Sequence, residues 1–286
     1  MAAGAQAADV EHVIHIVVEG LNSDMLQDLV ENQNGSGDYD GFQRLIDEGA
    51  SSYNARSDYS HTLDLPNQAS MLTGRPVLQP AGQANTVQHG YTDDGDPGGA
   101  TLHSEQPNVS YVSSVFDVVH DNSLSTAFYG SQTKYVLFKN TYDGAGGPDP
   151  IPPDDGSNKL DSYLDDSLDM QAQYLVDLAD NDFTYTLLSY VDGDASGHQF
   201  GWGTSQWDTS MADVSTYLDE ILDLVGSDSQ LTGKTAVIVT SDHGGGVSQS
   251  MDHTCATCVE HYTFRSLLLD VPLPSDRGVL NLLLLN

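Results

Sequence analysis

The chain has 286 residues, of which 42 are acidic and nine are basic, so its formal net charge is −33. A surface of this charge repels nucleic-acid phosphates and anionic lipid heads, so we expect neither nucleic acid nor a membrane as a partner. No apolar run approaches the roughly 18 residues of a membrane span, and we expect a soluble globular protein. The acidic surface suits high salt, where counter-ions screen self-repulsion; a calcium-loaded surface is the alternative.

Patterns typical of strands and helices alternate along the chain. Short apolar runs that suit buried strands occupy residues 12–18, 125–130, 183–191 and 234–240. Apolar residues at helical spacing predict helices at residues 23–33, 42–46, 161–180 and 206–225, and Asn22 is a plausible N-cap for the first of them. This alternation predicts an α/β fold with a largely parallel sheet and helices on both faces.

Three segments depart from the alternation. Residues 1–8 end like a secretory signal, so we expect a single domain over residues 9–286 in a secreted or periplasmic protein. Residues 79–158 are rich in Pro, Gly, Asp and Asn, which predicts a loop-rich insertion over the site, interrupted by one strand and a helix near residues 112–119. The apolar end of the chain either completes the core or belongs to a domain truncated at its C-terminus.

The two cysteines, Cys255 and Cys258, are separated by two residues. A zinc ribbon needs two such pairs, so this pair alone is not a complete structural zinc site. A local disulfide or two free thiols is the ordinary interpretation, and a metal-binding role is the alternative.

Acidic and histidine side chains follow three of the predicted strands. Glu19 follows the first strand, Asp194 and His198 follow the strand that ends at residue 191, and Asp242 and His243 follow the one that ends near residue 240. One Asp at a strand end is usually a turn or capping residue, but ligands of parallel sheets bind where several strands end together. Carboxylate plus imidazole suits zinc, and two such ions can hold the attacking and leaving oxygens of a phosphoryl transfer. The pattern therefore predicts a site for two divalent metal ions, most simply zinc.

At these residues the sequence resembles the type I phosphodiesterase/nucleotide pyrophosphatase branch of the alkaline phosphatase superfamily. The similar segments, in family order, are "IHIVVEGLNSDML", "HTLDLPNQASMLTGRPV", "DASGHQFGWG", "TSDHGGG" and "DHTCATCVEHYTFRSLLL". The resemblance implies an alkaline phosphatase-like three-layer sandwich. It also implies metal-dependent hydrolysis of phosphodiesters or phosphomonoesters, with a small-molecule phosphoester as the substrate.

The resemblance further implies two sets of metal ligands. The sets are Asp194, His198 and His253 for one zinc ion, and Glu19, Asp242 and His243, with the nucleophile position, for the other. His253 is chosen over His261 because His261 lies at the start of the last strand. Glu19 stands where the family has Asp, and its extra methylene still allows it to reach a metal.

The nucleophile position is a larger departure from the family pattern. The family has Thr before a large apolar residue and Pro-Asn, whereas this chain has Asp64 there and its nearest threonine is Thr62. Asp64 could be a metal ligand in a slow or inactive site, it could attack phosphorus or assist a hydroxide, or Thr62 could take over. The departure also raises an alternative function, a catalytically impaired metal-binding relative that binds a ligand or a partner.

A third departure concerns the loop "HGYTDD". The family places an Asn near here, whose amide donates to the phosphate, and this chain has Asp94. A carboxylate would repel phosphate unless it is protonated or metal-bound, and Asn85 is a possible substitute. Asn85 and Asp94 are therefore the candidate substrate-binding residues, with the plain alternative that Asp94 is one more acid in an acidic loop.

Overall fold

The computed structural model describes residues 10–32, 38–106, 111–143, 158–165 and 169–270. The expected signal remnant and the apolar end of the chain lie outside these ranges. Within them, no helix has both the length and the apolar character that a membrane crossing requires.

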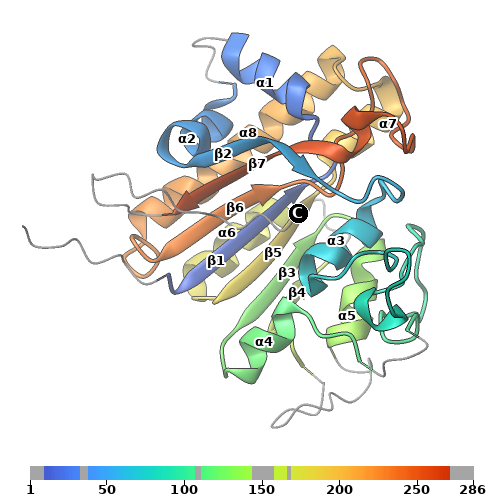
Figure 1. The fold of residues 1–286 in the computed structure, drawn as a ribbon. Coiled ribbons are helices and arrows are strands. Elements are labelled where there is room, and N and C mark those ends of the chain that lie inside the picture. Colours follow the sequence, from blue (N-terminus) through green and yellow to red (C-terminus); the bar gives the residue numbers. More distant parts are fainter. Residues whose placement is uncertain (1–9, 33–37, 107–110, 144–157, 166–168, 271–286) are drawn as a thin grey trace, which may run out of the picture.

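Within the described residues, seven strands form one mixed sheet in the order β2-β7-β6-β1-β5-β3-β4 (Figure 1). The strands are β1 (His12–Val18), β2 (Ala50–Arg56), β3 (Thr126–Gly130), β4 (Ser162–Leu164), β5 (Tyr185–Tyr190), β6 (Thr235–Thr240) and β7 (Thr263–Asp270). Strand β1 pairs in parallel with β5 and β6, and β3 pairs in parallel with β4 and β5. Strand β7 runs antiparallel to both β6 and β2. The sheet is mostly parallel, as predicted.

Helices cover both faces of this sheet, which confirms the predicted three-layer α/β architecture (Figure 1). The helices are α1 (Ser23–Asn32), α2 (Asp40–Glu48), α3 (Asp64–Thr73), α4 (Val115–Asp121), α5 (Val136–Tyr142), α6 (Met170–Asp180), α7 (Asp192–Phe200) and α8 (Ser205–Ser227), with the short 3₁₀ turns η1 (Asn85–Val87), η2 (Thr133–Tyr135) and η3 (Val259–Tyr262). Buried residues of α1, α2, α6 and α8 form one core, and those of α3, α4 and α5 form a second.

Successive side chains of the central strands alternate between the two cores. In β1, Ile16 and Val18 belong to the first core and Val17 to the second, and all three are fully buried. In β5, Leu188 belongs to the first core and Leu187 to the second. A strand covered on both faces is apolar at most positions, which explains why these segments appear in the sequence as apolar runs rather than as a strict alternation.

Most predicted elements form close to their expected positions, and the predicted N-cap is confirmed because the Oδ1 of Asn22 accepts a hydrogen bond from the N–H of Met25 at 3.1 Å. One prediction is wrong: residues 161–180 do not form a single helix, because 162–164 pair with β3 as strand β4 and the helix begins at Met170.

Helix α3 was not expected. Its Pro66 lies in the first turn, where the missing N–H would have had no helical partner.

Candidate metal centre

The carboxyl ends of β1, β5 and β6 lie next to one another because β1 pairs in parallel with both other strands. Glu19 follows β1, Asp194 and His198 lie in helix α7 directly after β5, and Asp242 and His243 follow β6. The topology therefore brings the three sequence-predicted groups to one edge of the sheet. Open parallel sheets bind their ligands at this edge.

The first group of side chains consists of Asp194, His198 and His253. The Nε2 atoms of His198 and His253 are 3.0 Å apart, and each lies within 3.6 Å of Asp194 Oδ1. The Nδ1 of His198 lies 2.9 Å from the carbonyl oxygen of Met251. A proton on that Nδ1, donated to the carbonyl, leaves the Nε2 lone pair directed toward His253 and Asp194.

The second group consists of Asp64, Asp242 and His243, all buried. Asp64 is the first residue of helix α3, and its Oδ1 lies 2.8 Å from His243 Nε2. Glu19, Asp64 and Asp194 form a third, overlapping group. Asp64 thus lies between the two predicted ligand sets, and a carboxylate in the first turn of a helix is favoured by the helix dipole.

Stacked imidazole rings join the two groups. His243 and His253 lie face to face with 3.9 Å between ring centroids and 4° between ring planes. Buried Trp202 packs its indole edge-on against His198 and His253 and donates its Nε1–H to the carbonyl of Gly20 at 3.1 Å. The indole therefore supports the histidines from behind.

Neutral hydrogen-bond donors surround Glu19, and the sequence analysis did not single them out. Tyr135 and Ser189 donate their hydroxyl hydrogens to Oε1 of Glu19, and Gln132 donates to Oε2 at 2.9 Å. Gln68, one helical turn after Asp64 on α3, donates to Oδ2 of Asp242 at 3.0 Å. Gln132 and Tyr135 come just after β3, Ser189 lies near the end of β5, and Gln68 lies one turn along α3. Their positions close to strand ends and to Asp64 were the sequence signal that could have identified them.

Lys134 is the most consequential residue that the sequence analysis missed. It lies in η2, just after β3, and its Nζ hydrogen-bonds to Oδ2 of Asp64 and, at 3.1 Å, to Oδ2 of Asp94. The other oxygen of Asp94 accepts the N–H of Leu65 in the first turn of α3 at 2.8 Å. Lys134 could have been identified from the sequence, because a basic residue close to the end of a predicted strand is rare in a chain that has nine basic residues.

Two further candidate residues do not face the cluster. Thr62 is buried, and its hydroxyl donates to the carbonyl oxygen of His253 at 2.6 Å rather than facing the carboxylates. Asn85 begins the 3₁₀ turn η1, and no hydrogen bond within the described part of the chain joins it to the ligand groups. Asp94 reaches Asp64 through Lys134, so of the two candidate substrate-binding residues only Asp94 adjoins the cluster.

Burial and mutual repulsion govern the ionisation of these acids. Burial, and then repulsion from Asp64, raises the pKa of Asp194 to about 7 and that of Asp94 to about 6. The same two causes raise the pKa of Glu19 well above its usual range. Burial acts on Asp64 too, but the hydrogen bond from His243 and the charge of Lys134 outweigh it and lower the pKa of Asp64. Glu19 and Asp194 are therefore the acids that would exchange a proton for a cation.

The chemistry of the donor set fits a pair of metal ions. Asp194 Oδ1 is a buried atom that has no hydrogen-bond partner among the residues the structure describes, and an unpaired buried polar atom is costly. Four carboxylates of the cluster have at most 7% of their surface exposed, namely Glu19, Asp64, Asp194 and Asp242. Buried charges of one sign need compensation, which divalent cations supply.

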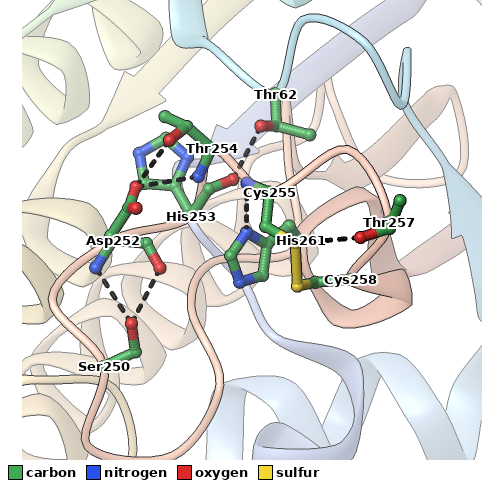
Figure 2. Close-up of a disulfide and its surroundings, with 9 residues drawn as sticks. All are labelled: Thr62, Ser250, Asp252, His253, Thr254, Cys255, Thr257, Cys258 and His261. Atoms are coloured by element: carbon green, nitrogen blue, oxygen red, sulfur yellow. Dashed lines mark hydrogen bonds between the residues drawn. A yellow bond between two sulfur atoms is a disulfide. The ribbon is translucent and has the colours of Figure 1, made fainter.

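A disulfide lies two residues after His253 in the same loop (Figure 2). Cys255 and Cys258 are bonded, with 5.3 Å between their Cα atoms, so the disulfide interpretation of this pair is confirmed. The N–H of Cys255 donates to Nδ1 of His261 at 2.9 Å, and the carbonyl of His261 accepts the N–H of Gly244 at 2.8 Å. The loop is thereby connected to the segment that carries Asp242 and His243.

A mostly parallel sheet between two helical layers, with carboxylates and imidazoles clustered at its carboxyl edge, places the chain in the alkaline phosphatase-like class of folds. Within that class, residues 13–263 match the type I phosphodiesterase / nucleotide pyrophosphatase family, and the chain belongs to this family. The resemblance read from the sequence is confirmed. No curated protein matches the chain.

Solved structures share the fold at low sequence identity. An inactive variant of murine ectonucleotide pyrophosphatase/phosphodiesterase 5 in complex with AMP is 15% identical, with a TM-score of 0.55 over 82% of this chain and 57% of that one. Alkaline phosphatase from the Antarctic bacterium TAB5 is 12% identical, with a TM-score of 0.53 over 92% of each chain. Phosphonoacetate hydrolase from Sinorhizobium meliloti 1021, in complex with phosphonoacetate, is 15% identical, with a TM-score of 0.52 over 83% of this chain and 57% of that one. This chain thus spans little more than half the length of two of them.

Proposed function

We propose that this chain hydrolyses phosphodiesters or phosphomonoesters with two zinc ions held at the cluster. The observation that carries the proposal is the burial of four carboxylates beside the paired imidazoles of His243 and His253. Family membership supports the reaction class, and the AMP and phosphonoacetate bound by the solved relatives support a small phosphorus-containing substrate. When bound, two such ions stabilise negative charge on the attacking and leaving oxygens.

The residues of the chain divide this work. One zinc ion would be held by Asp194, His198 and His253, and the other by Glu19, Asp242 and His243. The His198 side chain is 46% exposed while the His243 side chain is fully buried. Substrate and water therefore reach the cluster from the His198 side.

Asp64 acts in this proposal as a ligand between the two sets. Its oxygens are engaged by His243 and Lys134, and its lowered pKa makes it a weak base. A weak base is a poor nucleophile, so a hydroxide ion, which bound metal ions would make available from water at neutral pH, is the better attacking group. Thr62 is disfavoured because its hydroxyl is committed to the carbonyl of His253.

Zinc content and turnover test the proposal together. The chain is reconstituted with zinc in high salt, its metal is counted by elemental analysis, and bis-p-nitrophenyl phosphate and p-nitrophenyl phosphate are supplied as substrates. We expect about two zinc ions per chain, with turnover that His198→Ala abolishes. Exposed Asp213 on α8 offers the matched control, Asp213→Asn, which should change neither quantity. A chain that binds no zinc overturns the proposal.

The second candidate function is metal-dependent ligand binding without turnover, and the Asp64–Lys134 ion pair at the nucleophile position favours it. Asp64→Thr restores the hydroxyl of the family pattern and separates the two candidates. If the wild type shows no turnover and Asp64→Thr gains it, the chain is a phosphodiesterase scaffold that is inactivated at one position. Turnover by the wild type that Asp64→Thr does not improve identifies a working variant site.

A further inference from the structure

Lys134 occupies an unusual position for a lysine. Its side chain is 11% exposed and lies against Asp64, whose side chain is 4% exposed. Its Nζ lies between two carboxylates, with hydrogen bonds to Oδ2 of Asp64 and, at 3.1 Å, to Oδ2 of Asp94. The protein therefore holds an ammonium ion beside the metal cluster.

Asp94 holds this ammonium in place. One oxygen of Asp94 accepts the N–H of Leu65 at the start of α3, and the other lies 3.1 Å from Lys134 Nζ. Both oxygens are thus occupied by donors of the protein. Asp94 itself is poorly suited to contact a phosphate, although its position in the family pattern belongs to an amide that does.

The ammonium group has donor capacity left. A lysine ammonium carries three N–H donors in tetrahedral arrangement. Within the described residues, two carboxylate oxygens accept from Nζ, one of Asp64 and one of Asp94. The third N–H is available for a ligand oxygen, next to the residue that stands at the nucleophile position.

We propose that Lys134 is a substrate-binding residue that holds a non-bridging phosphate oxygen, with Asp94 as the residue that positions it. The ammonium then replaces the amide donor of the family pattern, and the two acidic departures, Asp64 and Asp94, are explained together because both pair with one cation. The inference rests on the proposed function for the class of ligand, a tetrahedral phosphorus oxyanion. It adds a recognition residue from η2, the turn after β3, which the predicted ligand sets do not use.

Binding of inorganic phosphate to the zinc-loaded chain tests the assignment directly. Isothermal titration calorimetry in high salt compares the wild type with Lys134→Met, and Lys139→Met is the control because Lys139 is an exposed lysine on α5. Loss of a charge-assisted hydrogen bond should weaken phosphate binding about 10- to 100-fold in Lys134→Met. The control should stay within about twofold, since Lys139 Nζ lies over the Tyr163 ring, 4.9 Å from its centroid, and the change alters the net charge by the same amount.

A double substitution tests the pairing with Asp94. Lys134→Met leaves the Asp94 carboxylate without its cation, and that charge repels phosphate. Asp94→Asn added to Lys134→Met removes the charge and restores an amide donor, so the double variant should bind phosphate more tightly than Lys134→Met alone. Independent effects, in which the second change weakens binding further, would contradict the pairing.

Failure of this inference is distinct from failure of the proposed function. If the chain binds phosphate through Lys134 but hydrolyses neither substrate, the inference stands and the hydrolase proposal fails. If Lys134→Met binds phosphate as tightly as the wild type does and holds the same amount of zinc, the inference is overturned. Lys134 is then only a counter-charge for Asp64. If the variants do not fold, a crystal structure of the zinc-loaded wild type with vanadate decides the matter. We expect Nζ at about 3 Å from a vanadate oxygen, and separation beyond hydrogen-bonding distance refutes the assignment.

Discussion

The hydroxyl of Thr62 donates a hydrogen bond to the carbonyl oxygen of His253, with 2.6 Å between the two oxygens (Figure 2). The two residues are 191 positions apart in the chain and both are buried. The contact fixes the backbone beside a proposed metal ligand and turns the hydroxyl away from the carboxylates. Thr62 is therefore a positioning residue for the His253 loop.

Thr62→Val should lower stability without abolishing turnover. Valine keeps the shape but leaves the buried His253 carbonyl without this donor, which costs about 1–3 kcal/mol of unfolding free energy. Chemical denaturation measures that loss, and turnover should stay within about tenfold of the wild type because His253 itself is retained. Thr216→Val, at an exposed helix position, is the control. Complete loss of turnover with full zinc content would instead make Thr62 the nucleophile.

Without metal, the protein should become less stable as pH rises from about 6.5 to 9. The raised pKa of Glu19, whose first cause is burial, means that the folded chain holds a proton that the unfolded chain has released. Asp194, whose pKa burial raises to about 7, adds to the loss only up to about pH 7. The pKa of His243 acts in the same direction: burial lowers it, but Asp242 and Asp64 raise it to about 9. His15 and His253, whose pKa values burial lowers to about 4 and about 3, oppose this trend only at lower pH.

Thermal unfolding across this pH range, in high salt with and without zinc, measures the effect. The melting temperature of the zinc-free chain should fall, whereas that of the zinc-loaded chain should change little because zinc takes the place of the protons. A zinc-free melting temperature that rises between pH 6.5 and 9 would contradict the assigned pKa directions.

Asp194→Asn should stabilise the zinc-free chain and weaken its response to zinc. Asparagine removes a buried charge whose pKa is raised to about 7 while keeping the side-chain volume. Near pH 8 we expect a gain on the order of 1–3 kcal/mol in the zinc-free state, measured by denaturant unfolding. Asp213→Asn should leave both states unchanged, and a destabilised zinc-free Asp194→Asn chain would show that the carboxylate has another structural role.

Reduction of the disulfide should release zinc from the His253 side of the cluster. A dithiol reductant supplies two electrons and two protons and converts the Cys255–Cys258 bond to two thiols. The loop that it frees carries the hydrogen bond from Cys255 to His261, so the position of His253 should become less fixed. A chromophoric chelator measures the release, and opening so short a loop should cost about 2 kcal/mol of stability or less.

The variant Cys255→Ser/Cys258→Ser is the control for this experiment. It should resemble the reduced protein, and the reductant should have no further effect on it. Release of equal amounts of zinc by the reductant from the variant and the wild type would point to direct chelation by the dithiol.

Gly245→Ala should be strongly destabilising. Gly245 has φ +74°, and a Cβ there would meet Trp202 Nε1 at 2.1 Å and the carbonyl oxygen of Gly20 at 2.7 Å. Both neighbours are held in place behind the histidines, so we expect a loss of about 3 kcal/mol or more together with lost zinc. Gly226→Ala in α8 meets no atom within 4 Å and should be neutral or slightly stabilising. A well-folded Gly245→Ala chain with full zinc content would show that Trp202 can move.

Much of the fold could be predicted because buried strands are locally distinctive. Strand β1 forms at the expected residues, since a run of β-branched side chains suits no other buried element so well. Strand β4 was mistaken for the start of a helix because its three residues carry the same apolar spacing as α6, and only pairing with β3 distinguishes them.

The sequence by itself determined the family and which acids and histidines follow β1, β5 and β6, because strand ends and motif spacing are local properties. Only the tertiary structure decided that Lys134 lies between Asp64 and Asp94, that Thr62 faces away, and that Asn85 is not bonded to the cluster. The orientation of a side chain depends on which distant backbone groups it meets. No local pattern encodes that η2 and the His253 loop both meet the start of α3.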